Sequence, residues 1–215
     1  MTETRAAYHA AHLTPDPARA VVWGAIADHL APWVPADAHV LEVGAGYCDW
    51  INQVRASRRL AVDIWPEVGR FAAAGVTAQV LDASRDLRSI GLGTFDTVLA
   101  SNVLDHFPPD PAAAVAADIA AVLKPGGRLI VIQPNFRYAY REYFDDYTHR
   151  AVFTDVSLAA LLRASGFTIE HVQARFAPYT MQRRRIAPRR WLVRAYLRSP
   201  IKPGAGQMLV IARKD

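Results

Sequence analysis

Two glycines and two acidic residues near the start of the chain have the spacing of a nucleotide-binding turn. The run 40–43 is predicted to form a buried strand that contains Glu42. The strand is followed by a tight turn that contains Gly44 and Gly46. Glycines at this place let the backbone approach a ligand closely. Asp63 follows Gly46 by seventeen positions and ends the next apolar run, so its carboxylate can accept hydrogen bonds from both hydroxyls of a ribose. The pattern predicts binding of a nucleoside-containing ligand.

The residues around the turn argue against a dinucleotide as that ligand. A pyrophosphate site has a further glycine at a helix N-terminus, whereas this chain has Tyr47, Cys48 and Asp49 there, which are bulkier and acidic. Glu42, inside the strand, also suits a ligand with a positive centre.

Glu42-x-Gly44-x-Gly46 followed by Asp63 resembles motif I and the acidic residue after it in class I S-adenosylmethionine-dependent methyltransferases. Cys48 departs from the third glycine that this family often has, but its side chain is still small. The resemblance implies S-adenosyl-L-methionine as the cofactor. It implies that the glycine loop wraps the amino acid part of the cofactor and that the acid after the second strand holds the ribose. The expected contacts here are Glu42, Gly44, Ala45, Gly46, Asp63 and Ile64.

Later motifs extend the resemblance over about residues 38–133. Asp82, with Ala83 beside it, matches the acid that holds the exocyclic amine of adenine, although a turn acid capping the next helix fits equally well. The segment 95–104 resembles motif IV and ends beside the cofactor at Ser101 and Asn102, and His106 is expected to line the cofactor pocket. The run 123–127, Leu-Lys-Pro-Gly-Gly, matches the turn into the fifth strand.

The segment 134–150 is the best candidate for the acceptor side, because it is long, aromatic and ionisable. A hydroxyl acceptor must lose a proton, and His149 is the most suitable base in the segment, with Asp145 or Asp146 to orient it. The alternative is that these three residues pair with surface arginines at 137, 141 and 150. Other residues expected to contact the substrate are Asn135, Tyr138, Tyr143 and Arg150.

Apolar strands that alternate with helices indicate an α/β fold with a Rossmann-like, mostly parallel sheet covered on both faces. The resemblance implies seven strands in the order 3-2-1-4-5-7-6, with strand seven antiparallel. The expected strands are 39–43, 59–63, 77–81, 95–101, 128–133, 167–172 and 207–212. The expected helices are a leader over 1–15, one that starts at 16–17 with a proline in its first turn, and 49–56, 66–74, 111–123, 154–164 and 188–198.

The chain divides into an N-terminal helical cap over 1–35 and a methyltransferase domain over 36–215, with a basic insertion at 180–203 between strands six and seven. As a helix, 188–198 would have a cationic face and an apolar face. That helix could contact anionic lipid or a phosphorylated acceptor, or bind nucleic acid electrostatically. It could also simply pack on the sheet through Trp191, Val193 and Leu197 with its arginines in solvent.

Composition indicates a cytoplasmic protein that could also lie at the membrane surface. The chain has 215 residues, a net charge of +5 and one cysteine, so an internal disulfide is excluded. No apolar run reaches membrane-spanning length, and the N-terminus does not resemble a signal peptide. No metal is expected, because no Cys/His cluster has zinc spacing and His9 and His12 alone are weak ligands.

Together these features favour a methyltransferase that O-methylates a small molecule, sugar or glycolipid. The run 144–167 supports this hypothesis, because it resembles a bacterial subgroup associated with polysaccharide and glycolipid assembly. One rival hypothesis is methylation of RNA or protein, although 101–104 lacks the Asn-Pro-Pro-Tyr-like signature of enzymes that methylate nucleic acid amines. The other is a non-catalytic subunit that binds the cofactor and supports a partner.

Overall fold

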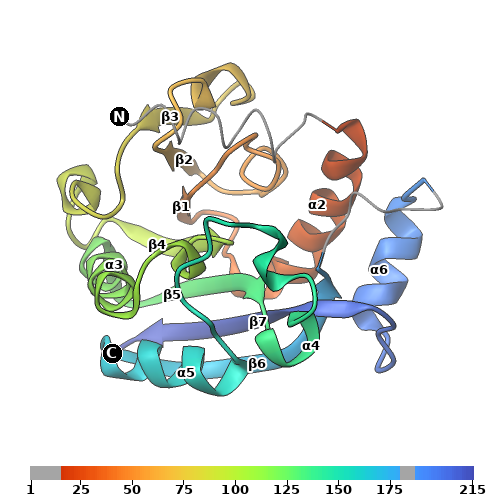
Figure 1. Cartoon of the computed structure of the whole chain (residues 1–215). Coiled ribbons are helices and arrows are strands. Elements are labelled where there is room, and N and C mark those ends of the chain that lie inside the picture. Colours follow the sequence, from red (N-terminus) through yellow and green to blue (C-terminus); the bar gives the residue numbers. More distant parts are fainter. Residues whose placement is uncertain (1–15, 180–186) are drawn as a thin grey trace.

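A single twisted sheet organises the chain in the computed structural model, which describes residues 16–179 and 187–215. Within these residues, seven strands lie in the order β3-β2-β1-β4-β5-β7-β6 (Figure 1). All neighbouring pairs are parallel except those of β7, which runs antiparallel to β5 and β6. The strands are β1 (His39–Val43), β2 (Arg58–Asp63), β3 (Thr77–Val80), β4 (Phe95–Ser101), β5 (Leu123–Pro134), β6 (Phe167–Pro178) and β7 (Ala205–Lys214). The expected fold class and strand order are confirmed.

Helices cover both faces of this sheet (Figure 1). The α-helices are α2 (Pro17–Leu30), α3 (Pro109–Val122), α4 (Phe136–Ala139), α5 (Asp155–Ala164) and α6 (Arg190–Arg198). Short 3-10 turns are η1 (Ala31–Trp33), η2 (Val68–Arg70), η3 (Leu87–Ile90), η4 (Leu104–His106) and η5 (Tyr143–Asp145). The chain therefore has three layers, with the sheet between two sets of helices.

Alternation along the central strands builds the two cores. Leu129 and Val131 of β5 face α3 and α5, whereas Ile130 and Ile132 face α2 and α6. Because β1, β4 and β5 are buried on both faces, their sequences read as nearly continuous apolar runs. The helix α2 contributes Ile26 to the second core, so it packs directly against the sheet.

Local signals place several helix ends where the sequence predicts them. Asp16 accepts a hydrogen bond from the amide of Ala18 at 2.9 Å and caps α2, with Pro17 at the first helical position. Thr154 and Ser157 form a reciprocal capping box at the start of α5. These contacts satisfy backbone amides that have no partner within the helix.

Two of the predicted helices are wrong. The segment 49–56 consists of turns, because Cys48 has a positive φ of 56° and the amide of Ile51 donates to the Glu42 carboxylate. Asp49, at the start of this segment, pairs with Arg19 at 2.6 Å. The segment 66–74 contains only η2, since the Asn52 side chain binds the backbone of residues 71 and 73 and replaces helical hydrogen bonds there.

β2 starts one residue early, at Arg58, and three other strands are much longer than expected. β5 starts at Leu123 rather than residue 128, β6 reaches Pro178, and β7 spans Ala205–Lys214. The pairing of β4 with β5 begins at Phe95 and shifts register before Thr97. Lys124 lies 2.8 Å from both carboxylate oxygens of Asp96, so an ion pair joins the two sequence motifs that meet at this irregularity.

Some expectations fall outside the described residues. These are the leader helix over 1–15 with His9 and His12, and the first part of the basic insertion, 180–186. Among the helices that the structure describes, none combines the length and the apolarity needed to cross a bilayer.

Candidate functional site

The turn after β1 has the open backbone that the sequence predicts. Gly44 and Gly46 have positive φ values of 70° and 49°, which L side chains rarely adopt. A Cβ placed on Gly46 would meet no atom of the described residues within 4 Å, whereas one on Gly44 would lie 2.5 Å from Val103 Cγ2. A ligand can therefore approach the backbone at Gly46, and Gly44 is needed for close packing against the segment after β4.

Asp63 fastens this turn to the tip of β2. Its Oδ2 accepts a hydrogen bond from the amide of Gly46, and its Oδ1 accepts one from the amide of Trp65, both at 2.8 Å. The side chain is buried. Asp63 thus has a structural role beside the ribose contact expected for it, and the sequence did not indicate this second role.

Glu42 lies beneath the turn rather than on its surface. It is buried, and its Oε2 accepts a hydrogen bond from the amide of Ile51 at 3.0 Å. Burial raises the pKa of Glu42 well above its ordinary range, and the bond from Ile51 offsets only part of this effect. Glu42 therefore shapes the turn from below, through its hydrogen bond from the amide of Ile51.

The other expected cofactor contacts lie at the same edge of the sheet. Ile64 and Ala83 are partly exposed just after β2 and β3. Asp82 accepts hydrogen bonds from the amide and hydroxyl of Ser84 at 3.0 and 2.6 Å, as expected of a turn acid. Asn102 has a positive φ of 51°, and its amide nitrogen lies 3.4 Å from the hydroxyl of Ser101.

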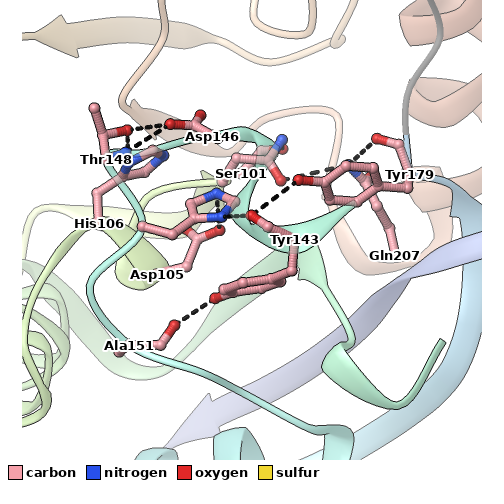
Figure 2. Close-up of polar contacts among 11 residues, drawn as sticks. Ser101, Asp105, His106, Tyr143, Asp146, Thr148, Ala151, Tyr179 and Gln207 are labelled. Atoms are coloured by element: carbon pink, nitrogen blue, oxygen red, sulfur yellow. Dashed lines mark hydrogen bonds and ion pairs between the residues drawn. The ribbon is translucent and has the colours of Figure 1, made fainter. Parts of the chain in front are cut away.

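A buried cluster of ionisable groups lies beside the turn, where the segment after β4 meets the segment after β5 (Figure 2). His149 Nε2 lies 3.3 Å from Asp105 Oδ2, and both side chains are almost completely buried. His149 Nδ1 lies 2.6 Å from the carbonyl oxygen of Tyr143. The amides of Arg150 and Ala151 donate to the carbonyl oxygen of Asp105, so backbone hydrogen bonds hold the two segments together.

His106 belongs to this cluster rather than only to the cofactor side. Its ring lies 5.0 Å from the His149 ring, centre to centre. Its Nδ1 is 3.0 Å from the hydroxyl of Thr148, which donates at 2.5 Å to Asp146 (Figure 2). Burial lowers the pKa of His106, and the negative charge of Asp146 acts in the opposite direction.

The carboxylate beside His149 is Asp105, so the expectation that Asp145 or Asp146 orients this ring is wrong. Burial raises the pKa of Asp105, and the charge of His149 acts against that rise. Asp146 instead accepts from Thr148, because both lie in the same short turn. The alternative that His149 pairs with surface arginines is also wrong, since its side chain is buried.

The residues expected to contact substrate separate into two groups. Asn135 is buried and bonds Asp155, the Ala174 carbonyl and the Arg137 amide, so its side chain is structural. Tyr143 is also buried, and its hydroxyl donates to the carbonyl oxygen of Ala151. Neither side chain is placed to bind substrate.

Tyr138 and Arg150, in contrast, are exposed. The same segment presents further exposed aromatic side chains. These are Tyr140, Phe144 and Tyr147. The acceptor side therefore has an aromatic surface beside the ionisable cluster.

The sequence interpretation missed Asp105 as a member of the site. The signal was an acidic residue directly before His106 in an otherwise apolar stretch, Val103-Leu104. Its contact with His149 joins positions 44 residues apart and depends on the tertiary fold. Because a Cβ on Gly44 would touch Val103, this cluster adjoins the glycine turn.

Comparisons with known proteins agree with this geometry. The profile of a family described as a methyltransferase domain matches residues 18–172. A search of curated protein sequences finds no match.

Several solved structures share the fold. An S-adenosylmethionine-dependent methyltransferase from Archaeoglobus fulgidus has a TM-score of 0.70 at 17% identity, covering 99% of this chain and 100% of that one. A Haloferax volcanii methyltransferase in complex with the Trm112 activator scores 0.66 at 15% identity, covering 94% and 99%. The 1,6-didemethyltoxoflavin-N1-methyltransferase of Burkholderia thailandensis, with its substrate and S-adenosylhomocysteine bound, scores 0.60 at 24% identity, covering 98% and 84%.

Proposed function

Because the chain belongs to the methyltransferase domain family and uses S-adenosylmethionine, we propose that it transfers the cofactor's methyl group to a hydroxyl of a small molecule, sugar or glycolipid. The observation that carries the choice of a hydroxyl is the buried pair of His149 and Asp105 beside the glycine turn. A hydroxyl must lose a proton during transfer, whereas positioning alone is enough for many other acceptors.

The glycine turn fits the cofactor. Gly46 leaves open space where any other residue would place a Cβ, and Asp63 ends β2 beside it. The bound cofactor supplies an electrophilic methyl group on a sulfonium. In this proposal Gly44, Ala45 and Gly46 hold the amino acid part, Asp63 and Ile64 the ribose, and Asp82 and Ala83 the adenine, with Ser101 and Asn102 closing the pocket.

His149 is our proposed base, with Asp105 rather than Asp145 or Asp146 as its carboxylate partner. A carbonyl oxygen can only accept a hydrogen bond, so the proton on Nδ1 points at Tyr143 and only Nε2 can receive another. Asp105 would stabilise the imidazolium that forms when Nε2 takes the acceptor's proton. The acceptor itself would lie against the exposed aromatic side chains of 138–147, which suit a sugar face or an aromatic ring.

Product analysis tests this proposal. The full chain, S-adenosylmethionine with a labelled methyl group and a panel of sugars, phenols and amines are incubated, and products are identified by mass spectrometry. We expect O-methylated products and much slower turnover by His149→Gln, at unchanged affinity for S-adenosylhomocysteine. Products methylated on nitrogen would favour RNA, protein or amine acceptors instead. Binding of the cofactor without turnover would favour a subunit that needs a partner.

A pair of matched variants tests whether the exposed aromatic side chains of 138–147 contact the substrate. Phe144→Ala removes an exposed ring from the proposed acceptor surface, and Leu92→Ala removes an equally exposed apolar side chain beside η3. We expect the first variant to raise KM for the acceptor with little change in stability, and the second to leave KM unchanged. Equal KM values for both variants would place the acceptor elsewhere.

We also propose that α6 contacts anionic lipid peripherally. Arg190 and Arg194 pair with Asp28, and Leu197 is buried, so these residues hold α6 on the protein. Trp191 and Ile201, by contrast, are 63% and 77% exposed, and Leu192 is exposed beside them. Val193 and Leu197 pack against the core as the simpler interpretation of this helix expects, whereas Trp191 does not. Exposed arginines at 189 and 198 flank the apolar side chains.

Vesicle binding tests this contact. Trp191→Ser should weaken binding to phosphatidylcholine vesicles that contain phosphatidylglycerol, and added salt should weaken binding of the parent protein. Arg194→Ser is the control for removing an arginine that already pairs with Asp28. Equal binding by the parent protein and Trp191→Ser would mean that the helix only packs on the protein.

A further inference from the structure

Asp105, His106 and His149 form a group that can hold a cation. One ligand atom from each lies within 4.8 Å of the other two. We propose that these three side chains bind one divalent transition-metal ion, for which zinc is the natural probe. Two histidines and one carboxylate favour zinc or its transition-metal neighbours over calcium and magnesium, which prefer oxygen ligands.

Asp105 supplies the first observation. Its side chain is completely buried, and among the described residues no other side chain hydrogen-bonds its carboxylate oxygens; His149 Nε2 lies 3.3 Å from Oδ2. A buried carboxylate is strongly unfavourable unless hydrogen bonds or a cation compensate its lost hydration. His149 Nε2 lies 3.3 Å from Asp105 Oδ2, so a cation held between these two groups would compensate the buried carboxylate.

His149 supplies the second observation, through the protonation of its ring. Nδ1 faces the carbonyl oxygen of Tyr143, which can only accept, so the proton of the neutral ring lies on Nδ1. Nε2 then presents a lone pair toward Asp105. A lone pair that faces a buried carboxylate is repulsive unless a proton or a metal ion lies between the two groups.

His106 is arranged in the same way. The hydroxyl of Thr148 donates its proton to Asp146, so its oxygen accepts from Nδ1 of His106. The lone pair of the neutral ring is therefore again on Nε2. Metal-binding histidines commonly donate their second ring nitrogen to a backbone carbonyl or to a carboxylate-linked group, which fixes the ligating nitrogen. His149 has the first kind of partner, the carbonyl oxygen of Tyr143, and His106 has the second, the hydroxyl of Thr148 that donates to Asp146.

The distances are compatible with a shared ion. Two ligands at about 2.0–2.2 Å from a tetrahedral zinc ion lie roughly 3.3–3.6 Å apart. Asp105 Oδ2 and His149 Nε2 are separated by 3.3 Å. The remaining separations lie within 4.8 Å, so a shared ion would require a small rotation of the partly exposed His106. Three protein ligands leave one position open, as in catalytic zinc sites.

The use of this ion in catalysis rests on the proposed function. The acceptor hydroxyl would bind at the open position and lose its proton to water more readily. Its oxygen would bond to the methyl carbon as the carbon–sulfur bond breaks, and the electron pair would stay on sulfur in S-adenosylhomocysteine. In the metal-loaded protein His149 would be a ligand rather than the base, so metal binding decides between the two roles.

Calorimetry with zinc alone tests the site without cofactor or acceptor. The full-length protein is stripped with a chelator and titrated with zinc, with magnesium as a comparison. We compare the parent protein with His106→Ala and with Asp105→Asn, which keeps the size of the buried side chain. His171→Ala is the control, because it removes a partly exposed histidine of β6 that contacts only the Trp33 ring among the described aromatic groups. Circular dichroism confirms that each variant is folded.

We expect one zinc ion per chain in the parent protein and in His171→Ala, with little binding of magnesium. Either ligand variant should weaken zinc binding by at least about tenfold, since losing even an outer hydrogen bond of a metal site costs 10–100-fold in affinity. Zinc binding that is absent from the parent protein, or unchanged in both ligand variants, would overturn the proposal. That result would leave His149 paired directly with Asp105 and would not affect the proposed methyl transfer.

Discussion

Replacing Gly44 by alanine should destabilise the protein through two separate effects. The backbone there has a φ of 70°, and the left-handed conformation costs a residue with a Cβ about 1–2 kcal/mol. The added Cβ would also lie 2.5 Å from Val103 Cγ2, and such overpacking costs about 1–3 kcal/mol. Together the free energy of unfolding should fall by about 2–5 kcal/mol.

A double-mutant cycle separates the two effects. Val103→Ala removes the methyl group that the new Cβ would meet, so Gly44→Ala combined with Val103→Ala should be more stable than the sum of the single changes predicts. The difference should be about 1–3 kcal/mol, the part due to overpacking. Gly46→Ala is the matched control, because its φ is also positive but nothing lies within 4 Å of the new Cβ. It should cost only about 1–2 kcal/mol and show no coupling with Val103→Ala.

Urea unfolding of the five variants and the parent protein measures all of these quantities. Coupling of less than about 0.5 kcal/mol between Gly44 and Val103, or equal coupling for Gly46, would refute the packing explanation. Calorimetry adds a functional contrast. Gly46→Ala should lose more affinity for S-adenosylhomocysteine than its small stability change suggests, because its Cβ enters the open space of the cofactor site.

Two further predictions concern the acidic residues around the turn. Asp63→Asn keeps one acceptor oxygen, so it can keep only one of the two hydrogen bonds from the amides of Gly46 and Trp65. The free energy of unfolding should fall by about 1.5–3 kcal/mol, and the affinity for S-adenosylhomocysteine should also drop. Parental values in both urea unfolding and calorimetry would contradict this prediction. Burial raises the pKa of Glu42 from its ordinary value of 4.5, so the native state holds that proton more tightly than the unfolded chain does. The stability of the parent protein should therefore fall as pH rises from 4.5 through the raised pKa, and Glu42→Gln should lack this fall and be the more stable protein at pH 8. Urea unfolding from pH 5 to 9 measures the difference, and parallel curves for the two proteins would show that Glu42 does not titrate in this way.

The sheet was predictable because its signals are local. Each central strand is an apolar run bounded by glycine, proline or polar residues, and Asp16 and Thr154 are helix caps that can be recognised from sequence alone. The glycine turn was predictable for the same reason, because Gly44 and Gly46 must adopt backbone conformations that other residues avoid. Such features depend on only a few neighbouring residues.

The acceptor side was less predictable because its contacts join distant parts of the chain. His149 was recognised by its chemistry, but its partner Asp105 belongs to another segment and was not identified. Asn135 and Tyr143 have side chains common in binding sites, yet tertiary contacts use all or part of their polar groups within the protein. The predicted helix at 49–56 failed similarly, since the carboxylate of Glu42 competes for a backbone amide there.

The position of β7 has a consequence for how the protein is made. β7 lies between β5 and β6, and β6 pairs with no other strand in the part of the chain that the structure describes. During synthesis, β6 therefore emerges from the ribosome with both edges unpaired and stays so until residues 205–214 follow. The outer edge of β5 is open for the same period. Unpaired strand edges are templates for association with other chains, so this interval is when the nascent protein is most exposed to misassembly.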